Sequence, residues 1–247
     1  MLTDSETSFS QRANNVFVQW FGGRLIVLAF IACSALFIAF PHLDIAVARE
    51  FVLPSGEFVL AHHPIVLKIH HFISASARVL TITLAALLLL GLGARFGHVF
   101  AWAAARRRAV LYVFAVLALG PGLVVNALLK DQFGRARPAQ VTELGGERVF
   151  SRAFVISDQC HRNCAFVSGH AAYAALPLVG WFIARRRRAR IAWLSLGLGL
   201  GSVVGLVRMA MGGHFLSDVV IAIFITWFAA SICARVLLPK VIEDPQA

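Results

Sequence analysis

Three short polar segments carry the side chains whose types and spacing are suited to chemistry. The segments read KDQFGRARP at residues 130–138, VSGH at residues 167–170 and RMAMGGHFLSD at residues 208–218. Each of them contains basic or proton-transferring groups, and each lies at the edge of a strongly apolar stretch. If the intervening elements bring the three segments to one face of the molecule, these groups form a single site.

Three fixed positive charges come from Lys130, Arg137 and Arg208. An arginine fork matches phosphate oxygens two at a time, whereas a lysine acts as a point charge. Ser168 and Gly169 stand where a helix is expected to begin, so free backbone N–H groups and the positive end of the helix dipole face an anion. The glycine lets that backbone approach closely. The set predicts a binding site for a phosphate group.

Proton transfer and nucleophilic attack are suggested by two histidines and an aspartate. His214 and Asp218 are four residues apart, which is one turn on a helix, so the carboxylate is expected to hold one imidazole nitrogen and leave the other free to attack. His170 comes from a different segment and is suited to protonate a leaving oxygen, because imidazole titrates near neutral pH. Asp218 also lies in an apolar stretch, where an ionisable residue indicates function.

Each motif alone also has a purely structural explanation. Lys130 and Arg137 can extend along the apolar surface to lipid headgroups. Ser-Gly-His at the start of a helix can be a helix cap, and His214 with Asp218 can be a buried structural pair. The occurrence of all three motifs at the same face favours the catalytic interpretation.

The composition indicates a membrane protein. Of 247 residues, 59% are hydrophobic and 14% are charged, with a formal net charge of +11. A soluble domain would carry about a quarter charged residues. The apolar residues form runs long enough for membrane-spanning helices of roughly 20 residues. We therefore expect an all-α polytopic membrane protein. Its polar N-terminal residues do not resemble a cleavable signal peptide.

Six spans are expected to form a bundle in residues 22–238. They cover about residues 22–40, 78–96, 109–129, 167–184, 191–211 and 215–238. Arginine clusters at 106–108 and 185–190 lie between spans and are expected to stay cytoplasmic, rather than to bind nucleic acid. Tails 1–21 and 239–247 are then cytoplasmic as well. Segments 41–77 and 130–166, and with them the site, are then expected to face the periplasm of a bacterial inner membrane. The cations of segment 130–166 break the positive-inside pattern, so an inverted topology is the alternative.

Segment 41–77 contains four histidines, and its apolar residues are mixed with polar ones. We expect an amphipathic helix in the membrane interface, with Pro64 interrupting its start. The histidines are His62, His63, His70 and His71. A metal site is the alternative explanation for them, but no cysteine joins them, and contact with headgroups is the preferred one.

Four cysteines are spread along the chain. Cys33 and Cys233 lie within apolar spans and are expected to pack there. Cys160 and Cys164 face the outer compartment in this topology, where a disulfide is compatible with an oxidising periplasm. The pair can bridge if the backbone there is not regular helix. Zinc is the weaker alternative, since only His161 is adjacent.

The order Lys-x6-Arg-Pro, Ser-Gly-His and Arg-x5-His-x3-Asp resembles the signature of the type 2 phosphatidic acid phosphatases. That family belongs to the superfamily of bacterial acid phosphatases and vanadium haloperoxidases. The resemblance covers about residues 126–220, and the six-span layout extends it. The family pattern usually has proline and serine where this chain has Val167 and Val207. Neither change removes a charged or proton-transferring group.

The resemblance implies a metal-free reaction without a cofactor. His214 is expected to be the nucleophile that forms a phosphohistidine, Asp218 to orient it, and His170 to act as general acid. The expected phosphate ligands are Lys130, Arg137, Ser168, Gly169 and Arg208. Arg135 is expected to meet a second phosphate or the lipid headgroup.

The implied substrate is a phosphorylated membrane lipid. Candidates are lipid A, undecaprenyl pyrophosphate, phosphatidylglycerol phosphate and phosphatidate, and the tract CHRNCAFVSGH is similar to a subgroup that includes lipid A phosphatases. Two other functions are considered: a vanadate-dependent haloperoxidase, and a transporter that would place ionisable groups along its path.

Overall fold

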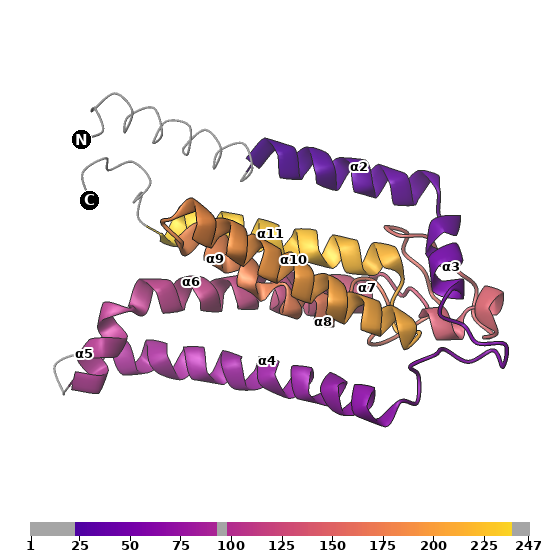
Figure 1. Ribbon diagram of the computed structural model, residues 1–247, viewed down its shortest axis with the longest axis horizontal. Coiled ribbons are helices and arrows are strands. Elements are labelled where there is room, and N and C mark those ends of the chain that lie inside the picture. Colours follow the sequence, from indigo (N-terminus) through magenta and orange to yellow (C-terminus); the bar gives the residue numbers. More distant parts are fainter. Residues whose placement is uncertain (1–22, 93–97, 239–247) are drawn as a thin grey trace.

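The computed structural model describes residues 23–92 and 98–238. Within these ranges the chain forms helices joined by loops, with isolated bridges but no β-strand, so the predicted all-α class is confirmed. The long helices run side by side along one axis (Figure 1). The expected tails, 1–21 and 239–247, and the end of the second expected span at 93–96 lie outside the described residues.

Two long connections separate the helices, one at residues 50–63 between α3 and α4 and one before α8. The longer ones are α2 (Leu25–Ala39), α3 (His42–Arg49), α4 (Pro64–Leu90), α5 (His98–Ala105), α6 (Arg107–Leu117), α10 (Arg187–Ala210) and α11 (Leu216–Leu237). The shorter ones are α7 (Lys130–Gln132), α8 (Gly169–Ala174), η6 (Leu176–Leu178), α9 (Val179–Ile183) and the 3-10 turns η4 (Pro138–Gln140) and η5 (Thr142–Leu144). A π-helical stretch, η3 (Ala118–Leu129), continues α6 into α7.

Within residues 23–92 and 98–238, four helices are long and apolar enough to cross a membrane. They are Pro64–Leu90, Arg107–Leu129, Arg187–Ala210 and Leu216–Leu237. Helices α2 and α3 add a fifth span if they count as one, although they meet at a bend of 85°. The fourth expected span is a shorter apolar stretch, Gly169–Ile183, in which the helix breaks near Pro177 because proline offers no N–H to the helical ladder.

Helix α4 begins inside the segment that was expected to precede the second span. The helix starts at Pro64 and runs without a break to Leu90, so positions 64–77 are continuous with the helix of that expected span. Pro64 occupies the first turn, where its missing N–H would have no partner in any case and its fixed φ suits a helix. The proline therefore begins the helix that it was expected to interrupt.

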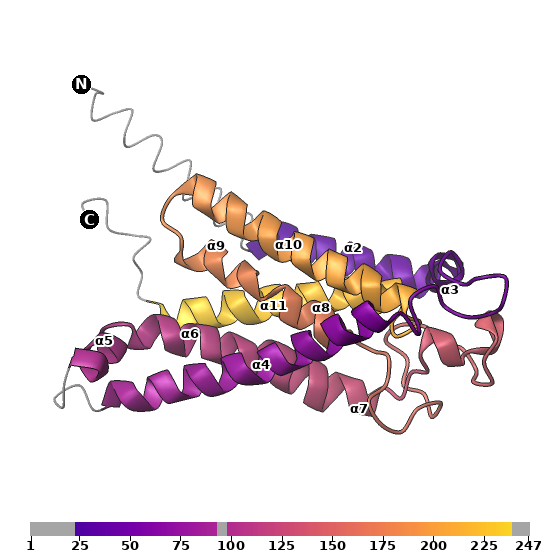
Figure 2. The ribbon, with the colours of Figure 1, turned by 60° about the horizontal axis from the view of Figure 1, so that its bottom comes forward.

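The core of the bundle is built around α11, which packs against α6, α8 and α10 (Figure 2). Three buried glycines, Gly197, Gly201 and Gly205, follow one face of α10 at every fourth position. A Cβ atom at Gly205 would collide with the side chain of Val219 in α11. Small residues of this kind let membrane helices approach closely. This close contact fixes the C-terminal end of α10 against the N-terminal end of α11.

Candidate active site

The three polar segments meet at the end of the bundle that carries α3. The main-chain N–H of Ser168 donates to the carbonyl oxygen of Asp218 at 3.1 Å, which joins the second segment to the third. A Cβ atom placed on Gly169 would lie 3.7 Å from Nζ of Lys130, so the first segment also reaches the start of α8. The residues singled out in the sequence are therefore neighbours in space.

His214 lies in the turn between α10 and α11 and is fully buried. Its Nδ1 is 2.7 Å from the carbonyl oxygen of Ala165. A carbonyl oxygen can only accept, so Nδ1 carries the proton and Nε2 presents a lone pair. Among the described residues, no group forms a hydrogen bond with Nε2. The geometry leaves Nε2 available as a nucleophile.

Asp218 does not hold His214 in the expected way. Its Oδ2 is 3.8 Å from Nδ1 of His214 and accepts a hydrogen bond from the main-chain N–H of Phe215 at 2.8 Å. Helix α11 begins at Leu216, after His214, so the spacing of four residues does not correspond to one helical turn. The carboxylate is a nearby negative charge for His214, and the carbonyl of Ala165 orients the ring.

Arg135 is buried within the protein, and the expectation that it meets a headgroup is wrong. Its side chain is 1% exposed, and it donates to Oδ1 of Asp218 at 2.6 Å and to Oδ2 of Asp44 at 2.7 Å. Nη1 also donates to the hydroxyl of Ser217 at 2.9 Å. Burial alone would lower the pKa of Arg135, but the two carboxylates more than offset this and raise it. Arg135 therefore ties α3 to the start of α11.

The other cations surround His214. Arg208 is nearly buried at the end of α10, and a Cβ atom at Gly213 would collide with its guanidinium. Burial lowers the pKa of His214 well below its usual range, and the positive charges of Arg208, Lys130 and Arg137 lower it further. Three cations from two of the polar segments therefore act at the position of this imidazole.

Two main-chain carbonyls from one loop position residues of the site. Arg137 donates from Nη2 to the carbonyl of Asn163 at 2.7 Å, and burial lowers the pKa of Arg137. The carbonyl of Ala165 is the acceptor for His214. A disulfide joins Cys160 and Cys164 across the same non-helical turn, with their Cα atoms 5.7 Å apart. The disulfide closes the turn that contains Asn163 and that ends one residue before Ala165.

The start of α8 combines an N-cap with a close approach to Asn126 of η3. Ser168 is buried, and its hydroxyl accepts from the main-chain N–H of Ala171 at 3.4 Å, which is the geometry of an N-cap. The ideal Cβ position of Gly169 lies 3.0 Å from Oδ1 of Asn126 in η3. The side-chain amide of Asn126 donates to the carbonyl of Pro121 at 2.6 Å. A larger residue at this position would therefore require the side chain of Asn126 to shift.

Sequence reasoning missed two residues of α4. Ser74 lies 3.0 Å from Nε2 of His170 through its hydroxyl oxygen. The rings of His70 and His170 stack with their centroids 4.3 Å apart, and Nδ1 of His70 is 3.3 Å from Nη1 of Arg208. His70 was expected at the membrane interface. The available signal was the spacing of His70 and Ser74, which share a face once α4 is known to start at Pro64.

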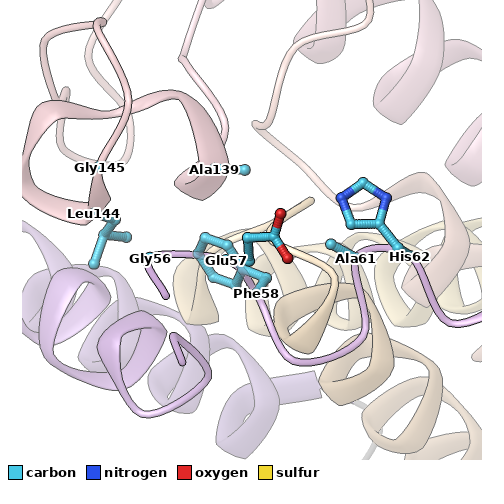
Figure 3. A pocket seen from close by; sticks show the side chains of 8 residues that line it. All are labelled: Gly56, Glu57, Phe58, Ala61, His62, Ala139, Leu144 and Gly145. Carbon is cyan, nitrogen blue, oxygen red and sulfur yellow. The ribbon is translucent and has the colours of Figure 1, made fainter. Parts of the chain in front are cut away.

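A pocket lies next to the turn before His214. Its lining includes none of the site residues that were expected from the three motifs. Figure 3 shows its lining, which comprises Gly56, Glu57, Phe58, Ala61, His62, Ala139, Leu144 and Gly145. The pocket adjoins the turn before His214, because a Cβ atom at Gly212 would meet Phe58 and Ala139. Among the described residues, no three His, Cys, Asp or Glu side chains are grouped as a metal site would require.

Comparisons with known proteins agree with the motifs. The model of the PAP2 superfamily matches residues 109–241. A lipid A 4'-phosphatase of Francisella tularensis subsp. novicida (strain U112) is 35% identical over 224 residues, which cover 85% of this chain and 96% of that protein. Lipid A 4'-phosphatases of Rhizobium leguminosarum and Rhizobium etli are each 32% identical over 55% of this chain, and the matches span 56% and 51% of those proteins. No solved structure matches the chain. The family match and the extent of the Francisella alignment show that the chain belongs to the PAP2 superfamily.

Proposed function

We propose that the protein is a membrane lipid phosphatase that hydrolyses a phosphate monoester, with lipid A as the leading substrate. The observation that carries this proposal is the convergence of Lys130, Arg137 and Arg208 on the buried imidazole of His214. Three cations beside a histidine with a free Nε2 suit a phosphate dianion that is attacked in line. The names of the Francisella and Rhizobium relatives support lipid A over the other three candidate lipids.

In the first step, Nε2 of His214 attacks phosphorus and forms a phosphohistidine. The bond to the leaving oxygen breaks, and His170 gives that oxygen a proton. Lys130, Arg137 and Arg208 hold the charged oxygens, and each donor already in place contributes about 3 kcal/mol in comparable sites. Ser168 and the amide of Gly169 are proposed to complete the phosphate contacts.

In the second step, water attacks the phosphohistidine. His170 now removes a proton from the water, phosphate is released, and His214 returns to its neutral form with a proton on Nδ1. The carbonyl of Ala165 accepts that proton's hydrogen bond throughout. The cations take the place that a divalent metal fills in other phosphatases, so we expect full activity in excess EDTA.

The site is proposed to face the periplasm in a chain that crosses the inner membrane six times. Helices α2 and α3 would form one bent span, and the short stretch Gly169–Ile183 another. The arginine clusters at 106–108 and 185–190 lie at the α5–α6 and α9–α10 junctions, at the end of the bundle away from α3 (Figure 1). Such clusters stay cytoplasmic. Labelling of single cysteines at Arg108 and Arg152 in intact cells tests this orientation, because only position 152 should react with an impermeant reagent.

A phosphate-release panel on the purified protein tests the function. Lipid A, undecaprenyl pyrophosphate, phosphatidylglycerol phosphate and phosphatidate are compared, and mass spectrometry of the lipid A product identifies the phosphate that is lost. His214→Ala should abolish release while the exposed control His63→Ala retains it. Normal turnover by His214→Ala, or no release from any of the four lipids, would contradict the proposal.

A further inference from the structure

We infer that α4 completes the catalytic site, with Ser74 and His70 as positioning residues for the general acid and for a phosphate-binding arginine. This inference rests on the proposed phosphatase function and assigns it two residues outside residues 109–241, the segment that matches the family. Both side chains lie on one face of α4, one helical turn apart, and both contact His170. None of the three sequence motifs contains them.

The contacts of Ser74 determine which proton it holds. Its hydroxyl lies 3.1 Å from the carbonyl oxygen of His70, to which it donates, and 3.0 Å from Nε2 of His170. A hydroxyl has one proton, so in this arrangement Nε2 of His170 is the donor and Ser74 the acceptor. Ser74 therefore keeps the proton of His170 on Nε2 and fixes the orientation of its ring.

With Nε2 held by Ser74, Nδ1 of His170 is the atom that delivers the proton. The step balances: the bond between Nε2 of His214 and phosphorus forms, the bond from phosphorus to the leaving oxygen breaks, and the proton on Nδ1 of His170 moves to that oxygen. Ser74 touches neither phosphorus nor the leaving oxygen. It acts through His170.

His70 links the general acid to a cation. Arg208 can only donate, so Nδ1 of His70 accepts from Nη1 of Arg208 at 3.3 Å and presents a lone pair. On its other side the His70 ring stacks on His170, with an interplanar angle of 25°. One side chain of α4 therefore fixes both the guanidinium that binds phosphate and the ring that protonates the leaving group.

A leaving-group comparison distinguishes positioning of the acid from general damage. The probes are dodecyl phosphate, whose alkoxide is a poor leaving group, and 4-dodecylphenyl phosphate, whose phenoxide needs little protonation. General acid catalysis contributes about 10²–10⁴-fold, so partial misplacement in Ser74→Ala should lower kcat/KM on the order of tenfold for the alkyl ester. The loss for the aryl ester should be about twofold or less, because the acid contributes little there.

Ser76→Ala is the matched control, because Ser76 lies in the same helix and its hydroxyl donates to the carbonyl of Ile73 within that helix. It should hydrolyse both esters like the wild type, and Ser74→Thr should recover much of the alkyl activity. Equal losses on both esters in Ser74→Ala, or no loss on either, would overturn the role of Ser74. If the wild type itself releases phosphate from no monoester, the proposed phosphatase function fails. That outcome is distinct from a failure of the role of Ser74, in which the wild type is active and the Ser74→Ala variant does not discriminate between the esters.

His70→Phe separates the two contacts of His70. Phenylalanine keeps a ring against His170 but removes the acceptor for Arg208, so inhibition by orthovanadate should weaken about tenfold, as expected when a bidentate oxyanion contact is disturbed. The alkyl-to-aryl ratio should stay close to that of the wild type. His63→Phe is the control at an exposed position of the same region. Unchanged vanadate inhibition in His70→Phe would overturn the role of His70.

Discussion

His214 donates its Nδ1 proton to the main-chain carbonyl of Ala165, which lies 2.7 Å away. The imidazole that we propose as the nucleophile is therefore oriented by a main-chain carbonyl and not by the aspartate that follows it in the motif. Ala165 comes directly after the turn that the disulfide between Cys160 and Cys164 closes, and the same turn supplies the acceptor for Arg137. The geometry of the proposed site thus depends on a segment that carries none of the proposed catalytic side chains.

Opening this disulfide should impair catalysis. In Cys160→Ser/Cys164→Ser the carbonyl of Ala165 is less constrained, and because a displacement of about 1 Å can cost 10²-fold in rate, we expect kcat/KM to fall on the order of tenfold or more. Phosphate release from lipid A, with and without dithiothreitol, measures the effect. Cys33→Ser is the control, since Cys33 is not bridged. Equal activity of the double variant and the wild type would show that the loop holds its shape without the bridge.

Removal of Arg135 should destabilise the protein. Arg135→Met leaves the buried carboxylates of Asp44 and Asp218 without their common partner, and breaking a buried ion pair in this way costs about 3–5 kcal/mol. Thermal unfolding in detergent should show a clear decrease in Tm. The exposed control Arg152→Met should change stability by less than about 0.5 kcal/mol.

A double-mutant cycle tests whether the network acts as a unit. When Asp44→Asn is combined with Arg135→Met, the second substitution should cost less than it does alone, because only the carboxylate of Asp218 then loses its charged partner. Additive losses would indicate that Asp44 and Arg135 stabilise the fold independently.

The buried neutral state of His214 predicts how stability depends on pH. Burial and the three cations lower its pKa in the folded protein, whereas in the unfolded chain the pKa is about 6.5. The unfolded chain then binds a proton that the folded chain does not, so the contribution of His214 is present above pH 6.5 and is lost as the pH falls below it. At pH 5.5 the loss amounts to roughly 1 kcal/mol.

This contribution is measured by difference, because other groups also titrate in this range. Tm is determined in detergent at about pH 7.5 and 5.5 for the wild type and for His214→Asn, whose amide does not titrate. The wild type should lose more stability on acidification than the variant. The same pH dependence in both proteins would mean that His214 takes up its proton as readily in the folded state as in the unfolded one.

Gly205 should tolerate no side chain, in contrast to a glycine one and a half turns earlier on the same helix. A methyl group at Gly205 collides with Val219, whereas nothing lies within 4 Å of the corresponding position at Gly199. Gly205→Ala should therefore lower stability by about 1–3 kcal/mol and reduce phosphate release by moving Arg208 relative to α11. Gly199→Ala should leave both intact. Equal behaviour of the two variants would show that the α10–α11 contact adapts freely.

The sequence by itself determined the class of protein and named the residues of its candidate site. Apolar runs of membrane-spanning length require helices, because lipid offers no partners for backbone polar groups. The three motifs named the histidines and cations that the structure brings together, since residue type alone limits which groups can bind a dianion or transfer a proton. The spans α10 and α11 were also placed nearly correctly, because their apolar stretches are long and clearly bounded.

Only the tertiary structure decided how these residues are held. It gave Arg135 two buried carboxylates as partners, gave His214 a main-chain acceptor in place of Asp218, and brought His70 and Ser74 of α4 against His170. These contacts join residues that are far apart in the chain, and they depend on where helices begin and how closely they pack. A linear pattern of residue types states which groups are available. It does not state which of several equally suitable partners lies within hydrogen-bonding distance.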